Sequence, residues 1–182
     1  MELHPAVVDA IFEHSARVAA LADPVARRLG WEGGPLQGLR LGSALHDVGK
    51  LSVSPEILRK PGPLDAVERA EIEQHPAAGA RLLEELSSAQ AALTYVLCHH
   101  ERWDGWGYPR GLAGTAIPVE ARLLAVADAY DAMTSDRPYR SALDPGVAFE
   151  EIERCAGTQF DPRIAYTFLA VWAEGAALAA TA

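Results

Sequence analysis

Helix-start signals recur along the chain, and they restrict its fold more than any other feature. Asp23-Pro24, Asp144-Pro145 and Asp161-Pro162 each place a carboxylate directly before a proline. The carboxylate can accept hydrogen bonds from the first turn of a helix, and proline suits the first helical position. Asp65 and Glu68 have the spacing of a capping box. The sequence therefore predicts four helix starts.

The spacing of apolar residues also indicates helices. Apolar residues recur at intervals of three and four over residues 36–45, 93–97 and 119–133, as on the buried face of a helix. The sequence shows no alternating strand pattern bounded by hairpin turns. We therefore expect an all-α protein with seven to nine helices.

Two segments rich in proline and glycine interrupt the helical pattern. Residues 52–63 are expected to form a short helix flanked by loops. Residues 103–118 form a longer loop that carries Trp103, Trp106 and Tyr108. A loop of this length inside a compact domain is usually functional, and its aromatic residues favour an ordered structure.

Length and composition predict one domain. A chain of 182 residues with a hydrophobic content of 49% suits a single globular domain. The sequence contains no internal repeat and no linker that would divide it. We expect a single domain over residues 1–182, with a core at about 10–172 and a fraying tail at 173–182.

Charge and cysteine content exclude several function classes. The formal net charge of −9 argues against binding a nucleic acid polymer through a basic face. The chain has only two cysteines, Cys98 and Cys155, and they lack the paired spacing of a metal-binding motif. A disulfide framework or a thiolate zinc site is therefore not expected. The sequence has neither a signal peptide nor an apolar run long enough to span a bilayer. We expect a cytoplasmic protein without a membrane partner.

Histidines and carboxylates are the main candidates for chemistry. One histidine alone is more often a surface residue or a hydrogen-bonded core residue than a ligand. As a set, imidazoles and carboxylates suit first-row transition metals, and a dinuclear site needs a bridging carboxylate. The candidates are His14, His46, Asp47, His75, His99, His100 and Asp128.

Two motifs carry a resemblance to a known family. The run from His46 to Lys50 resembles the HD motif of the HD superfamily of metal-dependent phosphohydrolases. The run from His99 to Pro109 resembles the signature of the HD-GYP subfamily, including its Gly-Tyr-Pro. Further matching motifs follow in order, and the resemblance extends over about residues 14–168. A lone HD pair would be weak support, whereas this ordered series is specific.

The resemblance implies a fold and an activity. The fold would be a single HD-domain helical bundle with a glycine- and proline-rich GYP loop. The activity would be a phosphodiesterase that hydrolyses cyclic di-GMP through hydroxide activated by the metals, with pGpG or GMP as the final product.

Residue roles also follow from the resemblance. Asp47, in the HD pair with His46, would bridge two metals and take part in catalysis. The other ligands would be His14, His75, His99, His100 and Asp128. Some relatives build a third metal position with a glutamate four residues before the first histidine, but Ala10 stands there in this chain. Glu13 would point about 100° away around the helix. We expect two metals, iron or manganese.

Lys50 is a candidate catalytic and substrate-binding residue. It follows His46 by four residues and would lie near the same face if the helix continued that far. Its ammonium would hold a phosphate oxygen or assist the leaving group. The alternative is a lysine that stabilises a helix end.

Three further residues are expected to bind substrate. Arg137 and Arg140 have the planar fork that suits a phosphate or a guanine edge, with a salt bridge as the alternative for Arg137. Tyr108 would stack on a base or else pack the loop against the domain. Glu101 and Asp104 are expected to orient His99 or His100.

Other functions remain open at the level of sequence. The same fold could hydrolyse another cyclic dinucleotide or a nucleoside phosphate. The chain could also be a catalytically weak signalling module. Such a module would bind cyclic di-GMP, or it would bind a diguanylate cyclase or another signalling protein through the GYP loop. Retention of every expected ligand and of Lys50 counts against the weak module.

Overall fold

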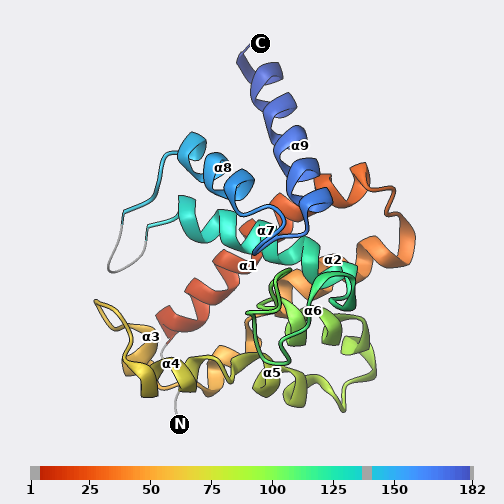
Figure 1. The fold of residues 1–182 in the computed structure, drawn as a ribbon. Helices are drawn as coiled ribbons and strands as arrows, with labels where there is room; N and C mark the ends of the chain where they lie inside the picture. The colour runs from red at the N-terminus through yellow and green to blue at the C-terminus, as the bar shows by residue number, and fades with distance from the viewer. Residues whose placement is uncertain (1–4, 137–140, 181–182) are drawn as a thin grey trace.

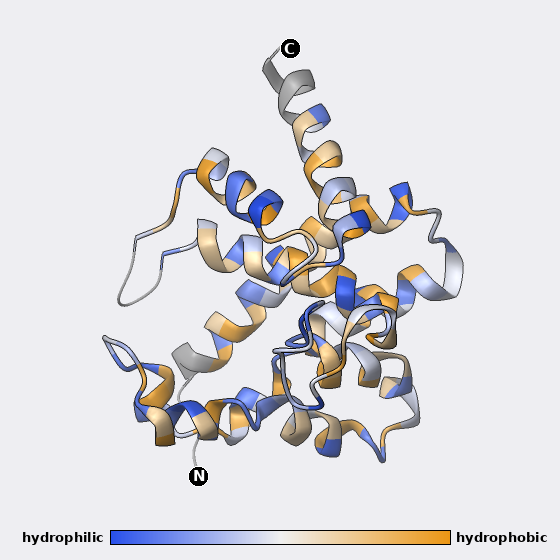
Figure 2. Ribbon diagram, viewed as in Figure 1, coloured by the Kyte–Doolittle hydropathy of each residue, from blue (hydrophilic) through white to orange (hydrophobic). Residues whose placement is uncertain are grey.

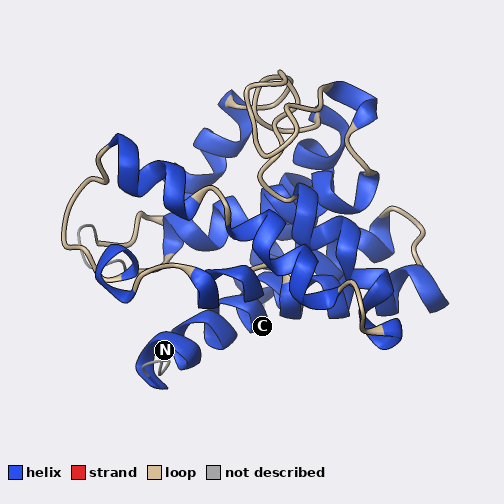
Figure 3. Ribbon diagram, turned by 90° about the horizontal axis from the view of Figure 1, so that it is seen from below, coloured by secondary structure: helices blue, strands red, loops and turns tan. Residues whose placement is uncertain are grey.

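The computed structural model describes residues 5–136 and 141–180, and it consists of helices joined by loops (Figure 1). Within these ranges Figure 3 shows no strand, and one isolated bridge joins Ala156 to Phe160. The all-α prediction is confirmed. The α-helices are α1 (Pro5–Arg28), α2 (Gly33–Leu45), α3 (Pro55–Leu58), α4 (Ala66–Ile72), α5 (His75–Leu83), α6 (Leu93–Cys98), α7 (Val119–Thr134), α8 (Pro145–Arg154) and α9 (Pro162–Ala180). The 3₁₀ helices are η1 (Val48–Ser52), η2 (Ser87–Ala92) and η3 (Gly114–Ala116).

The main core lies where the long helices cross. Val18 of α1, Leu39 of α2, Leu124 of α7 and Phe168 of α9 are all buried in one apolar cluster. Figure 2 shows apolar residues concentrated where α1, α7 and α9 meet. Burial of apolar surface is the dominant favourable contribution to folding. Because α1 and α7 lie side by side in this core, their polar faces meet at one end of it.

Three of the four predicted helix starts are confirmed. Asp65 opens α4 with a complete capping box that includes the side chain of Glu68. Asp144 caps α8 by accepting a hydrogen bond from the N–H of Gly146. Asp161 precedes α9 and accepts one from the N–H of Arg163. Each carboxylate satisfies N–H groups that have no partner within the helix.

The predicted start at Asp23-Pro24 is wrong, because Pro24 lies inside α1. A proline within a helix removes one backbone hydrogen bond. The buried face of α1 nevertheless continues through Ala22, Val25 and Ala26, so packing outweighs that loss. Asp23 does not cap a helix: its carboxylate accepts from the Nε atoms of Arg27 and Arg40, at 2.6 and 2.8 Å.

The two irregular segments are where the sequence placed them. Residues 52–63 contain the short α3 between loops, and residues 103–118 form a loop that is interrupted by η3. Helix α9 continues through residues 173–180, so the expected tail is helical as far as the structure describes it. Among the described residues, no helix is both long and apolar enough to cross a membrane.

Candidate metal centre

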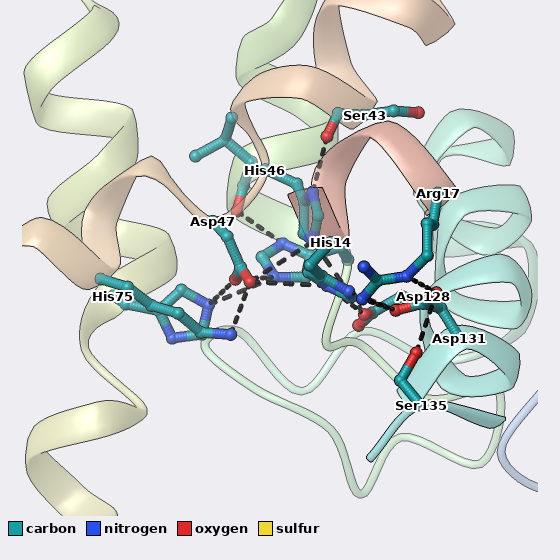
Figure 4. A network of polar contacts seen from close by, with 12 residues as sticks. His14, Arg17, Ser43, His46, Asp47, His75, Asp128, Asp131 and Ser135 are labelled. Carbon is teal, nitrogen blue, oxygen red and sulfur yellow. Dashed lines mark hydrogen bonds and ion pairs between the residues drawn. The ribbon is translucent and has the colours of Figure 1, made fainter. Parts of the chain in front are cut away.

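The seven candidate ligands, which are distant in sequence, lie together beside the main core. Figure 4 labels His14, His46, Asp47, His75 and Asp128 among them. Five parts of the fold supply them. Helix α1 carries His14, the turn after α2 carries His46 and Asp47, α5 begins with His75, the turn after α6 carries His99 and His100, and α7 carries Asp128.

Asp47 is shared by two groups of ligand atoms. Within each group the ligand atoms lie within 4.8 Å of one another. Asp128 borders the second group, because its Oδ1 lies 3.0 Å from Nε2 of His14. A carboxylate shared in this way can bridge two cations. The groups are Asp47 with His75, His99 and His100, and Asp47 with His14 and His46.

Backbone carbonyls fix the imidazoles in one orientation. Nδ1 of His46 donates to the Ser43 carbonyl at 2.8 Å, and Nδ1 of His75 donates to the Ile72 carbonyl at 2.7 Å. Nδ1 of His99 donates to the Val96 carbonyl at 2.9 Å. The proton of each neutral ring is therefore on Nδ1, and the lone pair of each Nε2 is directed into the cluster.

These inward lone pairs face one another without donors between them. Nε2 of His75 lies 3.2 Å from Nε2 of His99 and 3.3 Å from Oδ1 of Asp47. Within the described residues, Nε2 of His46 and Oδ1 of Asp47 are buried without a hydrogen-bond partner. Buried acceptors at such separations are costly when unpaired. A cation between them would satisfy all of them, so the residues fit a metal.

The charge states of the cluster also suit a metal. Burial would raise the pKa of Asp47, but the Lys50 ammonium holds it well below its usual range. Burial lowers the pKa of His46 to about 4, and it lowers the pKa of His75 and of His100. Neutral imidazoles and ionised carboxylates are the forms that bind metals.

His14 differs from the other histidines because its Nδ1 contacts a carboxylate. Asp131 Oδ2 lies 2.7 Å from this Nδ1, and Asp131 Oδ1 accepts from Nε of Arg17 at 2.6 Å. Although burial opposes protonation, hydrogen bonds to Asp128 and Asp131 raise the pKa of His14 to about 9. Carboxylate–histidine–metal arrangements orient the ring and increase its basicity.

Sequence reasoning did not assign a role to Asp131 or Arg17. Each lies three residues after a candidate ligand, Asp131 after Asp128 and Arg17 after His14. Residues at this spacing share a helix face, and their charges are opposite. That pairing was the available signal, but only the packing of α1 against α7 makes it a contact.

Lys50 lies at the cluster, although not through a continued helix. Helix α2 ends at Leu45, and the chain passes into η1 before Lys50. Its Nζ lies 2.5 Å from Oδ2 of Asp47. Lys50 therefore places a positive charge beside the shared carboxylate.

A cavity of about 700 Å³ opens over the cluster. His14, His100 and Asp128 of the cluster line it, together with Lys50. Tyr108 also lines the cavity and stacks on His100, with ring centroids 4.7 Å apart and an interplanar angle of 27°. The volume lies within the range of about 300–1,000 Å³ that small-molecule sites occupy.

The expected orienting role of Glu101 and Asp104 is wrong. Glu101 is buried, and its carboxylate accepts from the backbone N–H groups of Arg110 and Leu112 at 2.8 and 2.9 Å. Asp104 instead pairs with Arg102. Both carboxylates stabilise the loop, because they accept from backbone N–H groups that would otherwise be unpaired.

The structure tests some of the remaining sequence predictions and leaves others untested. Cys98 is a small buried residue, as expected. Glu13 is exposed beside the buried His14, which agrees with its exclusion as a ligand. Arg137 and Arg140 lie outside the described residues.

A known protein family matches most of this chain. The sequence matches the HD domain family over residues 5–164. The chain belongs to the HD domain family. Its His46-Asp47 pair, at the centre of the cluster, is the pair expected from the HD motif.

Curated relatives of this HD domain are phosphodiesterases by name. The chain is 39% identical over 158 residues to a cyclic di-GMP phosphodiesterase of Thermotoga maritima, which covers 86% of this chain and 43% of that protein. It is 40% identical over 149 residues to the 3'3'-cGAMP-specific phosphodiesterase 3 of Vibrio cholerae. This match covers 82% of this chain and 32% of that protein. The chain thus spans less than half the length of these relatives.

A solved structure supports the fold of this HD domain. Bd1817, an HDG"Y"P protein from Bdellovibrio bacteriovorus, superposes with a TM-score of 0.72 at 22% sequence identity. The match covers 89% of this chain and 52% of that one. At this identity, the likeness shows the helical HD fold.

Proposed function

We propose that this HD domain is a metal-dependent phosphodiesterase that hydrolyses cyclic di-GMP, with pGpG or GMP as the final product. The observation that carries the proposal is the set of buried Nε2 lone pairs directed at the shared carboxylate of Asp47. Relatives at about 40% identity are named as phosphodiesterases of cyclic dinucleotides.

We propose two divalent ions, iron or manganese, one at each group of ligands. Imidazole with carboxylate suits both metals, and no thiolate faces the cluster from the described residues. His14, His46 and Asp128 would hold one ion, His75, His99 and His100 the other, and Asp47 would bridge them. Bound ions would lower the pKa of water and draw charge from the phosphate oxygens.

Lys50 would bind a non-bridging oxygen of the phosphate. The net charge of the chain is −9, so an anionic substrate needs a local cation, and Lys50 lines the cavity next to the cluster. Preorganised positive charge stabilises the charge that develops on phosphoryl oxygens in the transition state.

The aromatic residues of the loop would bind the sugar and base portions. Tyr108 is held by its stack on His100 and lines the cavity, so its exposed edge is already placed for substrate. Arg137 and Arg140 are proposed to bind the second phosphate, on the basis of their sequence motif alone.

The extent, cellular location and protein partner of the domain are proposed as well. We propose a single HD-GYP unit over residues 1–182 in the cytoplasm, where Cys98 and Cys155, both free and buried, would stay reduced. Trp106 is 86% exposed on the GYP loop. A large exposed aromatic residue suits a protein partner such as a diguanylate cyclase.

A second substrate, 3'3'-cGAMP, is also supported. One relative that is 40% identical is named as specific for it. The residues of the cluster would hold metals that act on the phosphate and not on the base, so the same centre would serve either nucleotide.

The test is purification without oxygen, metal analysis, and incubation with cyclic di-GMP followed by chromatography of the products. We expect about two iron or manganese ions per chain and the appearance of pGpG or GMP. Asp47→Ala should lose both the metals and the products while keeping its helical circular dichroism. Bound metals with intact cyclic di-GMP and intact 3'3'-cGAMP would overturn the proposal.

A further inference from the structure

Four of the five histidines in the cluster have a hydrogen-bond partner that orients the ring. In three of them Nδ1 donates to a backbone carbonyl, and in His14 the partner is Asp131. Among the described residues, neither ring nitrogen of His100 makes a hydrogen bond of this kind. The orientation of this fifth ligand therefore needs a different explanation.

Contacts with other rings hold His100 instead. The ring of Tyr108 stacks on its imidazole, with centroids 4.7 Å apart and an interplanar angle of 27°. The rings of His75 and His99 also contact it, at centroid distances of 5.0 and 4.1 Å. A stacked pair is favourable in itself, and it fixes the plane of a ring while its edge stays free. His100 can therefore direct a nitrogen into the cluster without a hydrogen bond on the other nitrogen.

The backbone holds Tyr108 against His100. The N–H of Tyr108 donates to the carbonyl of His100 at 3.2 Å. A Cβ on Gly107 would lie 2.5 Å from the same carbonyl oxygen and closer still to the backbone nitrogen of Arg102. Only glycine lets the loop fold back so closely onto the residues around the ligand.

Glu101 anchors the loop again beyond Tyr108. It directly follows His100 in the chain, and its buried carboxylate accepts from the backbone N–H groups of Arg110 and Leu112. Glu101 makes no hydrogen bond to the His100 ring, and it acts on the loop alone. The stacked ring of Tyr108 is thus carried by a segment that is fixed to the backbone around the ligand.

We propose that Tyr108 is a positioning residue that orients His100 for metal binding through its ring, in place of the hydrogen bond that each other cluster histidine has. The inference rests on the proposed function in one respect, that the cluster binds metals. It gives the GYP loop a part in assembling the metal centre. Because His100 belongs to only one of the two ligand groups, loss of the stack should weaken that group and spare the group that contains His14.

The test is a titration of the metal-free protein with Co²⁺, followed by calorimetry and by visible absorption. Co²⁺ accepts imidazole and carboxylate ligands, and its absorption depends on their geometry. We expect Tyr108→Leu to weaken one of two binding steps by roughly 2- to 12-fold, the factor for one aromatic pair, and to change the spectrum of that step. Tyr108→Phe retains the ring and should retain both steps.

Trp106→Leu is the matched control. Trp106 belongs to the same loop and lines the same cavity, but it is 86% exposed and has no ring contact with a histidine among the described residues. Both Co²⁺ steps should be unchanged in this variant. Unchanged steps and spectrum in Tyr108→Leu would overturn the inference, whatever the KM of that variant for cyclic di-GMP. An equal loss in Tyr108→Phe would also overturn it, because the ring is still present.

A second measurement needs no metal. The ring current of a stacked tyrosine shifts the imidazole proton resonances of His100 in the nuclear magnetic resonance spectrum of the metal-free protein. We expect these resonances to move in Tyr108→Leu and to stay nearly in place in Tyr108→Phe. The resonances of His46, which has no ring contact with Tyr108, should stay in place in both. Unmoved His100 resonances in Tyr108→Leu would contradict the inference.

Hydrolysis separates the inference from the proposed function. If one Co²⁺ step weakens in Tyr108→Leu but the iron- or manganese-loaded unaltered protein leaves cyclic di-GMP intact, the proposed hydrolysis is refuted and the inference stands. Hydrolysis by the unaltered protein, with normal Co²⁺ binding in Tyr108→Leu, would do the reverse. Failure of the unaltered protein to bind Co²⁺ would overturn both.

Discussion

Asp131 Oδ2 lies 2.7 Å from Nδ1 of His14, and this contact joins α7 to α1 beside the metal cluster. Three other cluster histidines donate Nδ1–H to backbone carbonyls. His14 alone among these four is oriented by a carboxylate, which is itself held by Arg17. The ring is thereby fixed with Nε2 toward Asp128.

Asp131→Asn is expected to weaken metal binding through His14. The amide can still contact the ring, but it removes the negative charge that increases the basicity of the imidazole. Loss of such a partner typically costs 10- to 100-fold in metal affinity or activity. Metal titration of the apoprotein measures this effect. Ser135→Ala is the control, because its hydroxyl is 3.4 Å from the same carboxylate; an equal loss there would contradict the prediction.

Lys50→Met is expected to lower kcat by roughly 10²- to 10³-fold, the usual cost of losing one group that stabilises transition-state charge. Metal content should be retained, because lysine is not among the ligands. The chain has one other lysine, Lys60, which pairs with Glu68 at 2.5 Å and does not line the cavity. Lys60→Met should keep full activity. Normal turnover by the Lys50 variant would remove its assigned role.

Gly49→Ala is expected to destabilise the fold next to the metal cluster. A Cβ at this position would lie within 2.6 Å of the backbone nitrogen of Gly79 and closer still to the carbonyl oxygen of His75. Backbone atoms cannot move aside cheaply, so we expect a loss of about 1–3 kcal/mol or more in the free energy of unfolding. Denaturant unfolding measures it. Gly62→Ala, with nothing within 4 Å, should be nearly neutral.

Metal binding is expected to depend on pH through His14. Its pKa is raised to about 9 by Asp128 and Asp131, so in the metal-free protein the ring carries a proton at neutral pH. A metal must displace that proton. Apparent affinity at this position should therefore rise with pH up to about 9 and then level off. Calorimetry in buffers of different ionisation enthalpy would detect the released proton, and His14→Gln should abolish it.

The helical class of the protein and the members of the metal cluster could be predicted from the residues alone. Local capping chemistry decided three of four helix starts, because the carboxylates of Asp65, Asp144 and Asp161 each accept only from N–H groups of the turn that follows them. Packing decided the fourth: α1 continues through Pro24 because Ala22 and Val25 on both sides are buried in the core. The motif around His46 identified the centre of the cluster, since ligand residue types are set by metal chemistry.

The contacts that join these residues depend on how the helices pack. The sharing of Asp47 between two ligand groups and the pairing of Asp131 with His14 join residues from different helices. Periodicity reports which face of one helix is buried. It carries no information on which face of another helix lies opposite, because that depends on how side chains interlock across the core.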